Sequence, residues 1–378
     1  MNCSLCNIPF NKTKDSEEHI IPQSIGGKKT VTGFICENCN NKKGNEWDSK
    51  LAKHLNPLSI FFNIKRERGE VPPMRLNTSK GKEYIVSSDG GIFLPKPIYE
   101  EKHIPEEKKI TIHIKARNEK EAYQQIMRAK KSYPQIDTDS LIKQMKTTTA
   151  YIDDHFIFSI GGLDEACIKS IVKTALALAV KANIASEDCK YAKDYLQNIT
   201  STDCFGYFYE KDPILNRPKE VPLHCVFIKS DPNNKIIWAY IEFFALYRGL
   251  VCLSDYYEGE YIESYYAIDP RTSKQLLDLN ISLELSKQEL KKYIFINALS
   301  IEKIKEIMNE TIPYQLKLAQ DKERDRVITH AVNTAFTNCG VPEGETFTEE
   351  QWGEMVKKVV AEMEPWLINQ VKTRQRKS

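Results

Sequence analysis

The sequence predicts an α+β protein in which a small cysteine-rich N-terminal domain precedes a larger mixed region. Three observations support this fold class. Two Cys-x-x-Cys pairs lie within the first 40 residues, alternating apolar residues between about 220 and 270 predict an antiparallel meander, and helical periodicity returns beyond about 285. The 378 residues are enough for two or three domains of ordinary size.

We divide the chain into three parts by composition and pattern. Residues 1–58 are rich in cysteine, asparagine and lysine, residues 59–145 form a small α+β connecting region, and residues 146–378 form a C-terminal α+β region. In the first part, helical spacing over 46–55 places three apolar residues on one face: Trp47, Leu51 and Leu55.

The pattern of the connecting region predicts short strands and one helix. Two strands surround the Asp-Gly-Gly turn at 89–91, and a strand over 110–114 is followed by a helix from about residue 119. The C-terminal region opens with an apolar helix over 163–182 that we expect to be buried on more than one side. Its last helix begins after Thr348, a suitable N-cap.

Composition limits the class of protein. Hydrophobic residues make up 41% and charged residues 28% of the chain, as in soluble globular proteins, and no run of about 18 apolar residues predicts a membrane span. The N-terminus lacks the features of a signal peptide, so we expect a cytoplasmic protein with no membrane partner. The net charge of +2 argues against polyanion binding over the whole surface. The sequence contains no GxxxxGK[ST] motif, so it gives no indication of an ATP-driven motor.

Four of the ten cysteines have the spacing of a metal site: Cys3, Cys6, Cys36 and Cys39. Two residues between cysteines let both thiolates bind one tetrahedral ion, and two such pairs form a closed structural zinc site. The alternative, reduced core cysteines or a redox Cys-x-x-Cys, explains the doubled spacing less well. Bound zinc would supply much of the folding free energy of so short a segment. We interpret the other six cysteines as small core residues.

Basic residues accompany these pairs: Lys28, Lys29, Lys42, Lys43 and Lys50. They are candidates for contacts with nucleic-acid phosphates, whereas the simpler interpretation is a solvated surface.

Between the pairs the chain reads Glu18-His19-Ile-Ile-Pro and Gly26-Gly27, and the second pair continues as Cys39-Asn40-Asn-Lys-Lys-Gly. This pattern resembles the HNH endonuclease family, in its cysteine-knuckled branch, over roughly residues 3–55. The resemblance implies a zinc-stapled ββα-metal fold, with the histidine on a hairpin and a second metal ligand on a helix. It also implies a metal-dependent endonuclease that hydrolyses phosphodiester bonds of DNA, with RNA as the alternative substrate.

The resemblance implies roles for three residues. His19 would be the general base that activates water, and Glu18 and Asn40 would hold a catalytic Mg²⁺ or Mn²⁺. Imidazole ionises near neutral pH, a cation neutralises charge that develops on the phosphate, and carboxylate and carboxamide oxygens suit Mg²⁺. The simpler interpretations are a hydrogen-bonded histidine, a solvated acid beside Glu17, and an asparagine that caps the helix.

The sequence departs from the family at two positions. Many members have an asparagine nine residues before the last ligand, where it orients the histidine, but this chain has Val31. A backbone carbonyl or the hydroxyl of Thr30 or Thr32 would then hold the histidine. Gly44 stands where many members have a further histidine. We interpret Asp48 as a packing or helix-capping residue and not as a ligand.

The sequence leaves the role of the C-terminal region open. The tyrosine-rich stretch 247–266 would either stack nucleic-acid bases or fill one face of a sheet. The leading hypothesis is an endonuclease whose C-terminal region controls targeting or activation, with defence against foreign DNA suggested by analogy. The alternatives are a non-catalytic zinc-knuckle protein that binds nucleic acid, and a nuclease gated by a ligand-sensing or homo-oligomerising C-terminal region.

Overall fold

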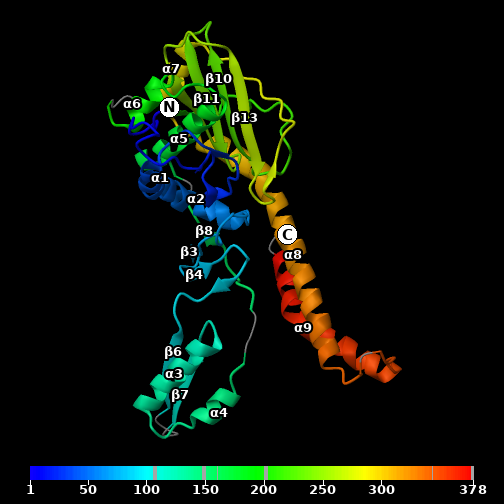
Figure 1. The fold of residues 1–378 in the computed structure, drawn as a ribbon. Coiled ribbons are helices and arrows are strands. Elements are labelled where there is room, and N and C mark those ends of the chain that lie inside the picture. Colours follow the sequence, from blue (N-terminus) through cyan, green and yellow to red (C-terminus); the bar gives the residue numbers. More distant parts are fainter. Residues whose placement is uncertain (105–108, 147–149, 160, 200–202, 343, 376–378) are drawn as a thin grey trace. The chain divides into compact units, whose positions relative to one another are not determined.

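The computed structural model describes residues 1–104, 109–146, 150–159, 161–199, 203–342 and 344–375 (Figure 1). It is an α+β protein with antiparallel sheets, as the sequence predicts. The chain divides into two compact units. The first comprises Met1–Met74, Val86–Gly91 and Phe158–Tyr314, and the second comprises Arg75–Ile85, Ile92–Ile157 and Gln315–Ser378. Within the described ranges, none of the helices combines the length and the apolar character that a membrane span requires.

The first unit begins with an irregular hairpin. β1 (Glu18–His19) pairs antiparallel with β2 (Thr30–Val31), and a 3₁₀ turn, Gln23–Ile25, lies between them. The loop is tight at Gly27, where a Cβ atom would lie 1.8 Å from the carbonyl oxygen of Ile21. Only glycine fits there without a backbone shift, because real Cβ atoms do not approach a carbonyl oxygen so closely.

A helix in three parts follows the hairpin. α1 (Glu37–Lys43) runs through a π-helical segment, Gly44–Asp48, into α2 (Ser49–Phe61). The face predicted from spacing is buried in the structure: Trp47, Leu51 and Leu55. Hairpin and helix together give the ββα order that the resemblance implies.

A six-stranded antiparallel sheet forms the centre of the first unit. Its strand order is β14-β13-β10-β11-β12-β9, so β10 to β12 form a meander and β13 returns to pair with β10. The bounds are β9 (Phe205–Tyr207), β10 (His224–Asp231), β11 (Ile236–Phe243), β12 (Tyr247–Ser254), β13 (Ile262–Asp269) and β14 (Lys274–Gln275). Every residue of β10, β11 and β12 is buried.

Helices cover both faces of this sheet. α5 (Glu165–Lys181) packs across β10 to β13, while α7 (Lys287–Ile296) packs against β9 and β12, and α6 (Lys190–Leu196) contacts α5 and β12. The N-terminal segment, α5 and one sheet face share a single apolar core, which includes Ile20, Leu51, Ile171, Ile228 and Ile241. The N-terminal segment is therefore not a separately packed domain in this structure.

Polar contacts also join the N-terminal segment to the sheet. His224 Nε2 lies 2.8 Å from the carbonyl oxygen of Ile25. The hydroxyl of Tyr266 accepts hydrogen bonds from the backbone N–H groups of Lys28 and Lys29, at 3.1 Å each. These contacts fix the loop between β1 and β2 against strands β10 and β13.

The second unit contains a small sheet, a hairpin and two long helices. The small sheet has the order β5-β4-β3-β8, and its strands are β3 (Met74–Thr78), β4 (Glu83–Val86), β5 (Ile92–Phe93) and β8 (Phe156–Ile157). The other elements are β6 (Ile98–Ile104), β7 (Lys109–Lys115), α3 (Glu119–Ser132), α4 (Thr138–Lys143), α8 (Ile301–Thr337), which begins in the first unit, and α9 (Glu349–Gln375).

The structure confirms the expected elements of this region. β4 and β5 flank the Asp-Gly-Gly turn, β7 is followed by α3, and the Thr348 hydroxyl accepts a hydrogen bond from the Gln351 N–H at the start of α9.

The scattered cysteines and the tyrosine-rich stretch have mainly packing roles. Five of the six cysteines are buried: Cys167, Cys189, Cys204, Cys225 and Cys252. Cys339 is partly exposed. Tyr247 and Tyr266 are buried, whereas Tyr256 and Tyr261 are 65% and 55% exposed. The stretch therefore fills a sheet face more than it offers a stacking surface.

Candidate functional site

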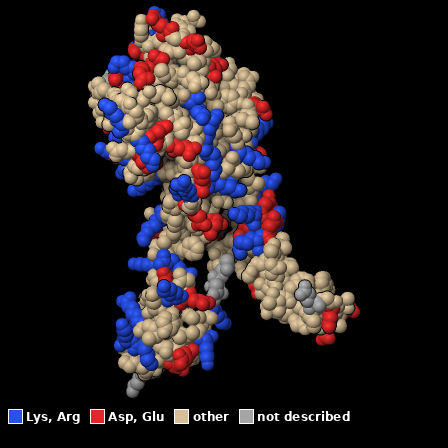
Figure 2. Space-filling view, viewed as in Figure 1, with Lys and Arg blue, Asp and Glu red and all other residues tan. Residues whose placement is uncertain are grey.

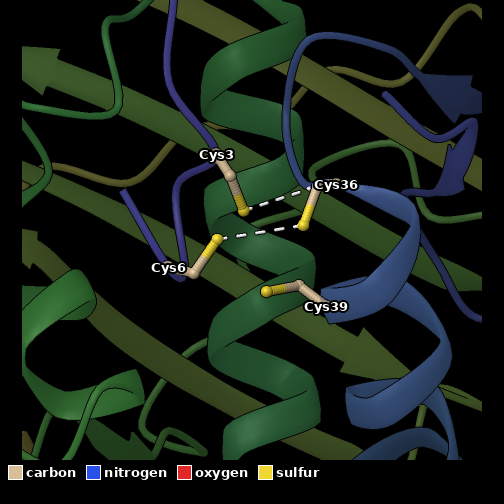
Figure 3. Close-up of side chains that lie close together, drawn as sticks. All are labelled: Cys3, Cys6, Cys36 and Cys39. Carbon is tan, nitrogen blue, oxygen red and sulfur yellow. Dashed lines mark hydrogen bonds between the residues drawn. The ribbon is translucent and has the colours of Figure 1, made fainter. Parts of the chain in front are cut away.

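The four cysteines predicted to bind zinc come together at the start of α1 (Figure 3). Their sulfur atoms all lie within 4.8 Å of one another, and Cys6 Sγ lies 3.8 Å from Cys36 Sγ. Two sulfurs bound at about 2.3 Å to a tetrahedral zinc ion lie about 3.8 Å apart. The cluster therefore fits a four-sulfur zinc site. Among the described residues, no other group of three or more His, Cys, Asp or Glu ligand atoms has metal spacing.

The surroundings of Cys36 favour the thiolate form that zinc requires. Burial raises the pKa of the Cys36 thiol, but hydrogen bonds from the Cys39 backbone and from Thr13 lower it by more, to about 7. In addition, the N–H of Cys36 donates to Cys3 Sγ at 3.3 Å. Because a thiolate binds metal and a thiol does not, these contacts favour zinc binding at Cys36. Burial has the opposite effect at Cys6 and Cys39, where it raises the pKa of the thiols.

His19 lies at the end of β1, with its side chain 27% exposed. Its Nε2 atom is 2.9 Å from Oε2 of Glu67, which lies in the loop after α2 and is 49% exposed. Thr30 stands opposite His19 in the hairpin, but its hydroxyl donates to Glu17 at 2.7 Å. The hydrogen-bond partner of the His19 ring is therefore Glu67, whereas neither Thr30 nor Val31 contacts the ring by a hydrogen bond among the described residues.

The contact with Glu67 defines which ring nitrogen of His19 is available. The hydrogen bond from His19 lowers the pKa of Glu67, so this carboxylate is ionised and only accepts. Nε2 of neutral His19 then carries the proton, and Nδ1 has the free lone pair. A base of this form can accept a proton from water at Nδ1.

Glu18 points to the other side of β1 and is buried. Its carboxylate accepts a hydrogen bond from Nζ of Lys173, which also donates to Oδ2 of Asp48 at 2.5 Å. Asp48 ends the π-helical segment, and its Oδ1 accepts from the Ser170 hydroxyl at 2.6 Å. Two residues of α5 thus hold two acids of the N-terminal segment. A π-helical turn inside an α-helix is frequent at functional sites.

Charge compensation keeps the Lys173 ammonium ionised although its side chain is only 1% exposed. Burial lowers the pKa of Lys173, but the charges of Asp48 and Glu18 raise it by more, so it lies above its ordinary value. Burial raises the pKa of Glu18 and Lys173 lowers it, with burial the larger effect. One ammonium is thus shared by the carboxyl groups of two acids.

Two oxygen atoms of the predicted ligands suit a divalent cation. Lys173 binds Oε1 of Glu18, and within the described part of the chain no hydrogen bond reaches Oε2. Among the described residues, no hydrogen bond reaches the carboxamide of Asn40 on α1 either. Such oxygens are the ligands that Mg²⁺ prefers, and with few protein ligands the ion keeps several waters. The donor types are therefore those that Mg²⁺ or Mn²⁺ prefers, but the ammonium of Lys173 already contacts Glu18, a contact that no sequence pattern indicated.

The candidate phosphate-binding lysines have different surroundings. Lys43 pairs with Glu46 at 2.8 Å and lies over the Trp47 ring, and Lys29 lies over the Tyr266 ring. Lys42 and Lys50 are exposed on the helix. Figure 2 shows acidic and basic side chains interspersed on the face drawn, in agreement with the small net charge. This face thus offers local basic groups more than a continuous basic field.

Sequence reasoning missed Glu67 and Lys173. Lys173 stands within the apolar run Ile171–Val180, and this position could have indicated a buried ion pair, because a fully buried lysine requires an acidic partner. Its partners could not be named, since they lie 155 and 125 residues away. Glu67 had no such signal, as it stands in an ordinary charged loop.

Comparison with known proteins supports the resemblance for the N-terminal segment. The family model of the HNH endonucleases matches residues 3–56. No curated protein and no solved structure matches the chain. The matched residues include all four clustered cysteines, the β1–β2 hairpin and most of the helix that follows. Residues 3–56 therefore carry the sequence of an HNH endonuclease domain.

Proposed function

We propose that this protein is a metal-dependent HNH endonuclease that hydrolyses phosphodiester bonds of DNA. The observation that supports this most is the hydrogen bond between His19, which lies on the β1–β2 hairpin inside the matched segment, and Glu67, which lies after that segment. The four-cysteine cluster belongs to the same matched segment. A partly exposed imidazole oriented by a carboxylate has the form of a general base.

In the proposed reaction, His19 accepts a proton from water at Nδ1 while Glu67 holds the opposite side of the ring. The water oxygen then attacks phosphorus, the bond from phosphorus to the leaving sugar oxygen breaks, and that oxygen takes a proton from solvent water and leaves as an alcohol. Glu18 and Asn40 would hold Mg²⁺ or Mn²⁺. The cation would neutralise the charge that develops on the phosphate. Lys28, Lys42 and Lys50 would contact neighbouring phosphates.

The proposal also includes the finer expectations about the rest of the chain. Residues 146–378 would control targeting or activation, and foreign DNA would be the target. Both expectations rest on analogy with nucleases that carry an additional region.

A plasmid cleavage assay with Mg²⁺, Mn²⁺ or Ca²⁺ tests the proposal. Wild-type protein should nick or cut supercoiled DNA with Mg²⁺ or Mn²⁺, and His19→Ala should lower the rate by about 10²–10⁴-fold, the usual contribution of a general base. His103→Ala, which removes an exposed histidine of β6, is the matched control and should cleave as the wild type does. Equal cleavage by wild type and His19→Ala would contradict the proposal.

The same samples distinguish the non-catalytic alternative. A zinc-knuckle binding protein should retain salt-sensitive DNA binding and show no cleavage with any of the three ions. A gated nuclease should stay inactive until a ligand or partner is added. Parallel assays on single-stranded RNA decide between the two nucleic acids.

A further inference from the structure

Lys173 lies in the middle of α5, far outside the segment that matches the HNH family, yet it reaches into that segment. Its ammonium donates to Glu18 of β1 and to Asp48 of the π-helical segment. With a side chain only 1% exposed, it is almost completely removed from water. A lysine is buried to this extent only when its charge is compensated, so both contacts are strong constraints on where the two acids lie.

The two acids belong to different elements of the ββα segment. Glu18 precedes His19 in β1, and Asp48 lies on the helix whose first part carries Asn40 and Cys39. β1 has only two residues, and in the described part of the chain it pairs with the two residues of β2 alone. So short a strand has little pairing of its own to hold it against a helix. Lys173 supplies a link between the strand of the proposed base and the helix of the proposed ligand.

Fixing Glu18 also fixes the direction of His19. Neighbouring residues of a strand point to opposite faces, so a β1 strand that keeps Glu18 against Lys173 must turn His19 outward toward Glu67. Asp48 has a second contact with α5 through Ser170, whereas Glu18 has no other hydrogen-bond donor to its side chain within the described residues. Loss of the ammonium would therefore displace Glu18 more than Asp48.

Lys169 shows that the arrangement is specific to Lys173. It lies one turn earlier on the same helix and is also buried, but its ammonium contacts Glu165 and Asn198, both in the C-terminal region. Lys169 thus contacts its own region, and among the described residues it makes no ion pair with the ββα segment.

We propose that Lys173 is a positioning residue of the nuclease centre, which holds Glu18 and thereby the strand that carries His19. This inference rests on the proposed endonuclease function. It assigns to the C-terminal region a direct structural part in cleavage, in addition to any part in targeting.

Full-length Lys173→Met, Lys173→Arg and Lys169→Met proteins test the inference. Lys173→Met keeps much of the side-chain volume and removes the charge, and we expect kcat to fall by about 10²-fold, as for partners that orient functional ligands. The KM for DNA should stay within about twofold, since Lys173 is buried and cannot contact a phosphate. Zinc content should not change. Lys173→Arg should recover part of kcat because it restores the charge, and Lys169→Met should retain the wild-type kcat.

A second measurement does not depend on activity. The NMR signals of the His19 ring and of the Thr30 and Val31 amides should move in Lys173→Met and stay in place in Lys169→Met. If Lys173→Met does not fold, the double variant Lys173→Met/Asp48→Asn removes the ammonium together with one acid. It should fold and still show low kcat and displaced His19 signals.

The outcomes separate this inference from the proposed function. Wild-type protein that cleaves DNA, with Lys173→Met unchanged in kcat and in the His19 signals, overturns the positioning role alone. Faster cleavage by Lys173→Met would also overturn it, since the ammonium would then block the centre. Wild-type protein that never cleaves, with His19 signals displaced in Lys173→Met, overturns the endonuclease proposal and leaves the structural link in place.

Discussion

His19 and Glu67 are 48 residues apart in the chain and 2.9 Å apart in the structure. The pair gives the histidine a defined tautomer and a defined direction, the two properties that a general base requires. Glu67 itself is half exposed, so the contact orients the ring more than it stabilises the fold.

Glu67→Gln should therefore lower kcat for plasmid cleavage without unfolding the protein. We expect a fall of about tenfold, in the lower part of the range for residues that orient a functional histidine. Glu70→Gln removes the same charge from an exposed position in the same loop and is the control. Steady-state rates of the two variants at equal ionic strength check the prediction, which a similar kcat for both would contradict.

His224 is a second histidine with a defined tautomer, but it is completely buried. Its Nδ1 accepts from the Phe244 N–H at 3.0 Å, so Nε2 carries the proton and donates to the Ile25 carbonyl. Burial lowers the pKa of His224 to about 4, although the hydrogen bond to Ile25 and the charges of Glu242 and Asp269 act in the opposite direction.

This lowered pKa predicts acid sensitivity. The folded state keeps His224 neutral, so its contribution is complete above the unfolded pKa of about 6.5 and is lost as pH falls toward 4. The difference corresponds to about 3 kcal/mol in the free energy of unfolding. Urea unfolding at pH 7 and pH 4.5 should show a smaller pH effect for His224→Gln than for wild type. The same pH effect in both proteins would refute this account.

At the scale of elements, zinc and α5 hold the ββα segment at different places. The cysteine cluster joins the N-terminal knuckle to the start of α1, whereas Lys173 and Ser170 hold the end of the π-helical segment. The two hairpin strands have only two residues each, so these links add to the apolar core that the segment shares with α5 and the sheet.

Cys6→Ser should release zinc and destabilise the first unit. Cys6 is exposed, so the change leaves no cavity and reports on the metal alone. We expect zinc per chain to fall and the melting temperature to drop, and a chelator should lower the melting temperature of wild type but not of the variant. Cys339→Ser, outside the cluster, is the control. Retention of one zinc per chain in Cys6→Ser would show that the fourth sulfur is dispensable.

The contrast between these elements explains what the sequence could predict. The cysteine spacing, the α5 pattern and the Thr348 cap are local, so their positions follow from neighbouring residues. Glu67 and Lys173 meet their partners only through tertiary packing, which no local pattern encodes. Asp48 shows the same limit: its position on the helix was correctly expected, but its contact with Lys173 was not.

At the scale of the whole molecule, the two compact units differ in their cores. The first has a continuous core that runs from the ββα segment through α5 to the sheet. The second buries few apolar side chains in its described part, among them Ile126, Val327, Ala331, Ala335 and Met355. A unit with little buried apolar surface has a small stability margin.

Differential scanning calorimetry should therefore show more than one transition. The transition of the second unit should occur at lower temperature, and a zinc chelator should shift the transition of the first unit alone. Far-UV circular dichroism at intermediate temperature should show loss of helix with the sheet retained. One transition that moves as a whole on chelation would mean that the two units unfold together.

The buried Lys173 also has a consequence for synthesis in the cell. The ribosome makes the matched segment first and adds Lys173 on the order of ten seconds later, at about 5–20 residues per second. Until then Glu18 and Asp48 lack their shared counter-charge, and Ile25 and Lys28 lack their partners on the sheet. A nascent or prematurely terminated chain would thus carry the cysteines and His19 without an assembled centre. If the proposed function holds, such fragments would have no nuclease activity.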